Sequence, residues 1–527
     1  MPVSNQSADA DESSRTALSR RRLTQLAGGG AIAGLAGCLT SGDEVADGTL
    51  RISGVSAPDS IDPAQGSGAL DRLGVYENLL GVDREMRVQS ELATDWGVDD
   101  DNLVWTFELR EDVNFHDGSS FDADAAEFAL DRAFDSADRL QAMPVESVEA
   151  TDTHELEITT TEPSAPLPAY LTLLDAAIIA PSSLDGGEFE QPVCTGPFAL
   201  SDWEPEVSYT VERNDDYYGT VPDLKRVIHE EVTDNQTKVL RLENADLDIS
   251  VQLPASSVDQ LQNNPDVEIT IYDVSALRFL AFNVDQPPFD DRAVRQAIAH
   301  AVDVEDLIDS VLEGIGEPAI GPLSPSLTHW ANEDLEPYTY DIDRADDLLT
   351  QAGWVREDDD SIRRRDGEAF SITLWTYQMR PELSLIAEIL QSQLQEIGID
   401  VSLRVTEWGA MDEAKQAGEF DVCLETWNAF WWPDPDRMMS FYHSEDTPIY
   451  TGYDDETANE LIERGRRAPD PDDRKAIYDE LQAHLHEDLP LAFLTYNQYV
   501  TGYRTAVEGF EPNRDYSYNL ENVSLNR

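Results

Sequence analysis

A strand, a helix and a second strand follow one another between residues 371 and 406. Residues 371–376 and 400–406 alternate apolar and polar side chains as strands do, and residues 382–397 between them have a helical period. Such a succession pairs the two strands in parallel through a right-handed crossover. This constraint predicts the α/β fold class for the chain.

The same alternation of strand and helix periods runs along most of the chain and becomes denser after Phe279. The expected strands cover residues 49–55, 104–110, 155–161, 209–213, 421–426 and 489–500. The expected helices cover residues 122–134, 289–312 (two helices) and 410–416. A further helix is expected to start near Asp434, and two more are expected between Asp454 and Asp488. Asp122 is an expected N-cap, and the two helices of residues 289–312 are expected to be capped near Asp290 and Asp303. With 527 residues the chain is too long for one core, so we expect two or three lobes.

Residues 19–38 have the form of an export signal. A charged segment with Arg20 and Arg21 precedes a short apolar stretch that ends in Leu35-Ala36-Gly37-Cys38. This predicts a twin-arginine signal joined to a lipobox, with Cys38 as the lipidated residue. The stretch is too short for a transmembrane helix, which needs about 20 apolar residues. A weakly hydrophobic N-terminal helix is the alternative.

The large excess of acidic residues indicates the solvent in which the protein works and does not indicate its activity. The formal net charge is −70, and only four lysines occur. Self-repulsion of this size destabilises a compact state, but molar salt shortens the screening length to about 3 Å. Because 41% of the residues are hydrophobic, disorder is not the explanation. We expect an organism of very high salt, a haloarchaeon, and no nucleic-acid partner.

Catalytic and metal-binding signatures are missing from the sequence. It has no Gly-x-Ser-x-Gly elbow, His-Glu-x-x-His pair, phosphate-binding loop or dinucleotide fingerprint. His484 and His486 are close in sequence but face different sides of a helix. We therefore expect no catalytic residues, no metal site and no cofactor. Cys194 and Cys423 remain after Cys38, and two unpaired thiols are favoured over a disulfide.

Aromatic residues gather near the end of one expected strand. Trp408, Trp427, Trp431 and Trp432 fall within 25 positions, with Phe430 among them. Ligands bind at the carboxyl ends of parallel strands, and aromatic faces there give apolar contact at small entropic cost. The alternative is that these rings fill a lobe core. As a group they favour a ligand site.

Five segments in order resemble the family of extracellular solute-binding proteins (family 5) that serve ABC importers of peptides, nickel and some oligosaccharides. They cover nearly the whole chain after residue 48 and include Val75–Leu80, Trp105–Gly118, Thr195–Phe198 with Arg213-Asn214 and Tyr217-Tyr218, Pro288–Asp303, and Ala345–Trp354. The resemblance implies a bilobal periplasmic-binding-protein-like fold (class II, cluster C type) with a third, smaller subdomain.

The export signal is expected to occupy residues 1–37, and a short acidic tether residues 38–48. The resemblance implies the boundaries of the rest: the first lobe combines residues 49–60, 189–277 and 489–527, the small subdomain is 61–188, and the second lobe is 278–488.

Site residues follow from the resemblance and from the aromatic group. Trp408 and Trp427 match aromatic cleft positions, Arg380 matches an Arg that pairs with a dipeptide's carboxylate, and Lys415 matches a basic position. The full set expected to contact ligand is Ser67, Ala69, Arg380, Trp408, Lys415, Trp427, Phe430, Trp431, Trp432, Asp434 and Tyr496.

One position departs from the family pattern. Phe430 stands where peptide binders carry an Asp for the peptide's amino group, and a buried ammonium without a carboxylate is costly. Asp434 or Asp436 is a possible substitute, unless the ligand lacks a cationic end. Cys194 also replaces the usual Gly before Thr-Gly-Pro.

The resulting hypothesis is a monomeric, lipid-anchored receptor on the extracellular face of the membrane. It captures peptides, or an oligosaccharide or other organic solute, and delivers them to an ABC permease with its ATPase. A secreted hydrolase and a surface receptor without a transporter are the rival classes.

Overall fold

The computed structural model describes residues 48–54, 60–65, 68–141, 143–358, 361–428, 433–444, 449–512 and 518–527. The predicted export signal, Cys38 and almost all of the predicted tether lie outside these residues. Among the described residues, no helix combines the length and apolar character that a membrane crossing requires.

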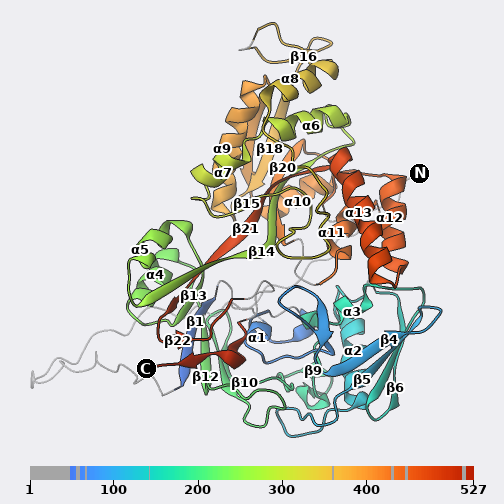
Figure 1. The fold of residues 1–527 in the computed structure, drawn as a ribbon, viewed down its shortest axis with the longest axis vertical. Helices are drawn as coiled ribbons and strands as arrows, with labels where there is room; N and C mark the ends of the chain where they lie inside the picture. Colours follow the sequence, from blue (N-terminus) through green and yellow to red (C-terminus); the bar gives the residue numbers. More distant parts are fainter. Residues whose placement is uncertain are drawn as a thin grey trace, which may run out of the picture. The chain divides into compact units, whose positions relative to one another are not determined.

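A mixed sheet organises the fold (Figure 1). Its strands, in spatial order, are β10 (Phe198–Glu204), β11 (Ser208–Arg213), β12 (Arg226–Glu231), β1 (Thr49–Gly54), β13 (Ile249–Leu253), β21 (Leu491–Arg504), β14 (Val267–Phe282), β20 (Val422–Asn428), β18 (Ser371–Tyr377) and β19 (Asp400–Thr406), with β15 (Glu317–Pro318) beside β21. The protein is thus an α/β protein, as predicted.

The predicted strand–helix–strand unit is confirmed. β18 and β19 pair in parallel from Ser371↔Asp400 to Tyr377↔Thr406, and α9 (Pro381–Glu396) connects them. Pro381 occupies the first turn of α9, where its missing N–H costs nothing. β20 joins the other edge of β18, also in parallel. The carboxyl ends of these three strands therefore meet at one edge.

Two long strands link the two parts of the sheet. β14 and β21 pair antiparallel from Val267↔Arg504 to Ala281↔Leu491, with register shifts near Leu277 and Phe279. They run side by side in Figure 1 from the neighbourhood of β13 to that of β20.

A second, antiparallel sheet lies in the N-terminal region. Its order is β4 (Ala93–Val98), β5 (Val104–Leu109), β7 (Glu155–Thr160) and β6 (Val145–Asp152), and α2 (Ala123–Ser136) packs against it. The Asp122 side chain accepts a hydrogen bond from the Ala125 N–H, so the predicted N-cap of α2 is confirmed.

The remaining long helices surround the parallel end of the large sheet. They are α6 (Arg292–Ala301), α7 (Val304–Ser310), α8 (Ile342–Gln351), α10 (Trp408–Gln416), α12 (Glu456–Arg467) and α13 (Pro471–Asp488), and α4 (Asn235–Glu243) lies beside β13. Asp303 caps α7 as expected. The cap of α6 is Asp291, next to Asp290 as expected, because the Asp291 carboxylate accepts from the Ala293 N–H.

Buried apolar side chains form three clusters within the described residues. Core A includes Phe279, Trp375 and Leu424; core B includes Leu50 and Phe107. Core C contains Leu242, Leu261, Val267 and Val500, among others, and lies where β14 and β21 leave core A. Core B takes residues from both the predicted first lobe and the predicted small subdomain, so these two regions share one apolar interior.

The two described cysteines are unpaired, as favoured from the sequence. Cys194 is buried in core B and Cys423 in core A. Burial raises the pKa of both thiols, with Glu77 adding to the effect at Cys194 and Glu425 at Cys423. Both sulfurs are therefore protonated and inert at neutral pH.

Candidate functional site

Four aromatic rings meet at the carboxyl ends of β18, β19 and β20. Tyr377 ends β18, Trp408 begins α10 directly after β19, and Trp427 is the penultimate residue of β20. The Trp408 and Trp427 ring centroids are 6.1 Å apart. Tyr377 meets Trp408 edge-on at 4.9 Å, and Phe441 meets Trp427 edge-on at 5.1 Å. We call these four residues the aromatic cluster.

The two tryptophans are the outer members of the aromatic cluster. Tyr377 and Phe441 are buried, whereas Trp408 and Trp427 are only half-buried. Burial raises the pKa of Tyr377 to about 12, so its hydroxyl is neutral. Partly exposed indole rings on a buried aromatic base provide a surface for a planar or apolar ligand group.

Lys415 supports this surface from inside. Its ammonium lies 2.5 Å from Glu425 Oε1, and both side chains are almost completely buried. The Trp427 indole N–H donates to the other carboxylate oxygen, Glu425 Oε2, at 3.1 Å. Lys415, predicted as a basic ligand contact, therefore pairs with Glu425, and Glu425 in turn fixes the orientation of the Trp427 ring.

Two arginines lie near each other at this end of the sheet, and one of them, Arg380, is also close to Tyr377 of the aromatic cluster. Arg380, predicted from the sequence, is exposed at the start of α9. Arg278, on β14, is buried and donates to Asn497 Oδ1 at 2.6 Å and to Thr495 Oγ1 at 3.2 Å; its guanidinium lies 3.6 Å from Glu382 Oε1. Within the described residues, Arg278 Nε has no hydrogen-bond partner.

The charges around Arg278 create a local surplus of positive charge. Burial lowers the pKa of the Arg278 guanidinium, the Glu382 carboxylate opposes that shift, and the positive Arg380 adds to it. Two guanidinium groups beside one carboxylate favour a ligand with a negative group. This local sign is opposite to the strongly negative net charge of the chain.

Other predicted site residues hold the structure around the site. The Tyr496 hydroxyl is buried, accepts from the Gly321 N–H at 3.1 Å and contacts the carbonyl oxygens of Gly321 and Leu323 at 3.0 Å. Asp434 is buried, and its two carboxylate oxygens accept hydrogen bonds from both terminal nitrogens of Arg474. Asp434 was one of the two carboxylates expected to replace the missing anchor for a ligand's amino group, but it is already paired with the buried Arg474 guanidinium.

Several predicted residues are not among those described. Ser67, Phe430, Trp431 and Trp432 lie outside the described residues, as does the Ala69 side chain. The structure brings Trp408, Trp427 and Lys415 together and places Arg380 near Tyr377.

Sequence reasoning missed Arg278, Tyr377, Glu382 and Asn497. A signal for Arg278 was present: it is a lone charged residue in the apolar run from Val274 to Phe282. The contribution of Asn497 depends on pairing between distant strands, which no local pattern reveals.

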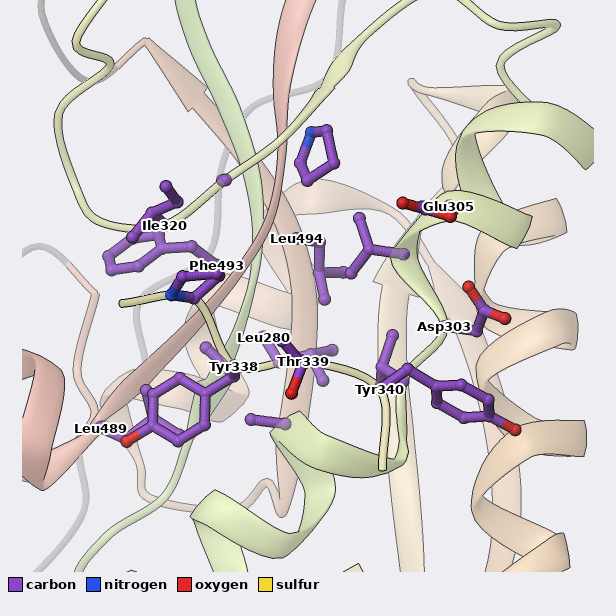
Figure 2. A pocket seen from close by; sticks show the side chains of 17 residues that line it. Leu280, Asp303, Glu305, Ile320, Tyr338, Thr339, Tyr340, Leu489, Phe493 and Leu494 are labelled. Carbon is purple, nitrogen blue, oxygen red and sulfur yellow. The ribbon is translucent and has the colours of Figure 1, made fainter. Parts of the chain in front are cut away.

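A separate pocket of about 450 Å³ lies beside β21 and the start of α7 (Figure 2). Leu280, Phe493 and Leu494 form much of its apolar wall, and Asp303 and Glu305 lie on the α7 side. Its described lining includes none of the predicted site residues, so it is distinct from the surface formed by the aromatic cluster.

Comparison with known proteins places the chain among extracellular solute-binding proteins. The model of the family "Bacterial extracellular solute-binding proteins, family 5 Middle" matches residues 87–448. The chain is similar to the glutathione-binding protein GsiB of Escherichia coli (strain K12), with 25% identity over 491 residues, which are 88% of this chain and 92% of that protein.

Two solved structures extend this similarity to the fold. NikA from Brucella suis, in complex with Fe(III)-EDTA, superposes with a TM-score of 0.82 at 25% identity and covers 91% of this chain and 100% of its own. The oligopeptide-binding protein AppA from Bacillus subtilis, in complex with a nonapeptide, has a TM-score of 0.73 at 25% identity, with coverages of 91% and 99%.

Proposed function

The chain belongs to family 5 of the bacterial extracellular solute-binding proteins, and on this premise we propose that it captures a peptide-like, negatively charged solute for an ABC importer. Members of this family are substrate-binding proteins of ABC transporters, so the chain is a receptor and not an enzyme. The secreted hydrolase considered from the sequence is therefore set aside.

One observation carries the choice of ligand class: the partly exposed Trp408 and Trp427 lie at the sheet edge where Arg380 begins α9, and Arg380 is close enough to both Tyr377 and Arg278 to influence their pKa values. The rings offer apolar contact and the arginines offer charge-assisted hydrogen bonds to a carboxylate. The names of the relatives agree with this chemistry, since glutathione, a nonapeptide and an EDTA chelate all carry carboxylates.

A neutral oligosaccharide is the second candidate. The partly exposed tryptophans favour it, because aromatic faces stack on sugar rings. The two arginines distinguish the candidates, since a neutral sugar gains little from a second guanidinium.

The setting of the receptor is part of the proposal. Export through the Arg20-Arg21 signal and lipidation at Cys38 keep a monomer at the outer face of the membrane, beside its permease and ATPase. The acidic surface suits molar salt. Lobe closure around the solute then delivers it to the permease. The lobe boundaries given from the sequence belong to the same proposal.

A ligand panel in molar salt tests the proposal. Glutathione, di- and oligopeptides, metal chelates of polycarboxylates and neutral oligosaccharides are compared by melting temperature and tryptophan fluorescence. At 100 times Kd a true ligand adds about 2.7 kcal/mol of stability. Stabilisation by a carboxylate-bearing solute supports the proposal. Stabilisation by a neutral sugar alone rejects the peptide assignment, and no shift with any solute rejects the ligand class.

A further inference from the structure

Three side chains from two helices converge on one point away from the aromatic cluster. Asp455 immediately precedes α12, and His484 and Asp488 lie one turn apart near the end of α13. One ligand atom from each lies within 4.8 Å of the other two. His484 Nε2 is 2.8 Å from Asp455 Oδ1 and 3.7 Å from Asp488 Oδ2. We call these three residues the His484 cluster.

The surrounding contacts hold the cluster in place. Asp455 Oδ1 also accepts the Ala458 N–H at 2.8 Å as the N-cap of α12. The Tyr453 hydroxyl donates to Asp488 Oδ2 at 3.0 Å, and Arg292 lies 3.3 Å from the other oxygen, Oδ1. Each carboxylate is therefore oriented by a neighbour, as the outer partners of metal ligands orient them.

The three atoms form a ligand set of a recognisable kind. One imidazole nitrogen and two carboxylate oxygens suit Zn²⁺ and related divalent ions, and three protein ligands leave positions open for water. The side chains remain about one quarter to one third exposed, so an ion can reach them from solvent. Arg292 opposes a cation, but it faces Asp488 Oδ1 and also pairs with Glu487, which leaves Oδ2 for the ion.

We propose that the His484 cluster is a binding site for a divalent transition-metal ion of the Zn²⁺ type. Binding replaces the hydrogen bond between His484 and Asp455 by a bond from His484 Nε2 and a bond from Asp455 Oδ1 to the metal, with the imidazole in the neutral tautomer that carries its proton on Nδ1. The ion then joins the start of α12 to the end of α13.

The position of the site gives it a structural role. α13 ends at Asp488, directly before β21, and Arg295 donates to the backbone carbonyls of both Asp488 and Leu489. β21 carries Asn497, the partner of Arg278. A metal at the His484 cluster therefore stabilises the element from which the candidate solute site is partly built. The proposal does not depend on which solute is bound.

The experiment uses the full mature chain, freed of metal with a chelator and titrated at neutral pH in molar salt with Zn²⁺ and, separately, with Co²⁺. Calorimetry gives the stoichiometry, and the visible absorption of Co²⁺ reports the coordination number and geometry of the bound ion. We expect one tight equivalent and a higher Tm when the metal is bound. Absence of binding by both ions overturns the proposal.

Variants separate this site from scattered surface carboxylates. His484→Gln and Asp455→Asn should each weaken binding at least tenfold. Asp455→Asn keeps an N-cap of equal quality, so the fold is retained even if His484→Gln were unstable. His486→Gln is the matched control, because His486 contacts the Glu336 carbonyl instead. Unchanged affinity in both cluster variants, or an equal loss in His486→Gln, overturns the assignment.

Discussion

The Lys415 ammonium and the Glu425 carboxylate form an ion pair in the interior, at 2.5 Å, with both side chains almost completely buried. Glu425 also accepts the Trp427 indole N–H, so one pair links the core of the parallel sheet to the aromatic cluster. Removing one partner of such a pair leaves an uncompensated charge in the interior.

We therefore expect Lys415→Met to destabilise the protein by about 3–5 kcal/mol. Lys415→Met combined with Glu425→Gln should recover part of this loss, because no charge remains buried. The control is Lys475→Met, which breaks a part-exposed pair with Asp479 worth at most about 1 kcal/mol. Denaturant unfolding in molar salt measures all three, and equal losses for Lys415→Met and Lys475→Met would contradict the prediction.

Trp427→Ala should weaken solute binding by about 2 kcal/mol, as is typical of a truncated tryptophan hot spot, which is roughly 30-fold in Kd. Trp427 is half-buried, so the fold should persist. Calorimetry with the ligand found in the panel measures the loss, and circular dichroism checks the fold. Trp203→Ala is the control, since Trp203 stacks on Tyr209 in another part of the sheet. Unfolding of Trp427→Ala would instead indicate a core role.

Arg380→Gln should weaken the binding of a carboxylate ligand by about 2 kcal/mol, the scale of a hydrogen bond to a charged group. A neutral ligand should lose little. The exposed Arg364, which donates to the Gly367 carbonyl, provides the control substitution Arg364→Gln. The measurement compares the Kd values of a charged and an uncharged analogue of one ligand for the two proteins. Equal losses of affinity for both analogues would show that Arg380 does not recognise the ligand's charge.

His229 should make the protein less stable in acid. Burial is the main cause that lowers the pKa of this imidazole to about 3 in the folded state, against about 6.5 in an unfolded chain. Below pH 6.5 the unfolded chain therefore binds a proton that the folded protein does not, and stability falls by about 1.4 kcal/mol per pH unit from this group. His229→Phe should remove this slope. Unfolding free energies of the two proteins between pH 7 and pH 5 test it, and parallel curves would refute it.

Gly196 should resist substitution because of a close backbone approach. A methyl group there would meet the Gly74 carbonyl oxygen and lie 2.7 Å from the Val75 carbonyl oxygen. Gly196→Ala should cost about 1–3 kcal/mol, as overpacking does. An added methyl at Gly97 meets nothing within 4 Å, so Gly97→Ala is the control. A Tm of Gly196→Ala equal to that of the control would show that the backbone yields.

Local periodicity was enough to predict the parallel unit and to expect aromatic residues at the carboxyl ends of its strands. Parallel strands end at one edge, so residues that follow them are neighbours whatever their separation in sequence. The partners of charged residues could not be predicted in this way. Asp434 is paired with Arg474, 40 positions away, and Arg278 with Asn497, 219 positions away. Such pairings depend on tertiary packing, which cannot be read from the spacing of residues along the chain.

The two buried cysteines have a practical consequence. Cys194 and Cys423 lie in separate cores and present no reactive thiolate to solvent. Cysteines introduced on the surfaces of two different lobes could be labelled with a donor and an acceptor dye while these native thiols stay in place. Energy transfer between the dyes would then follow the distance between the lobes in single molecules as solute is added.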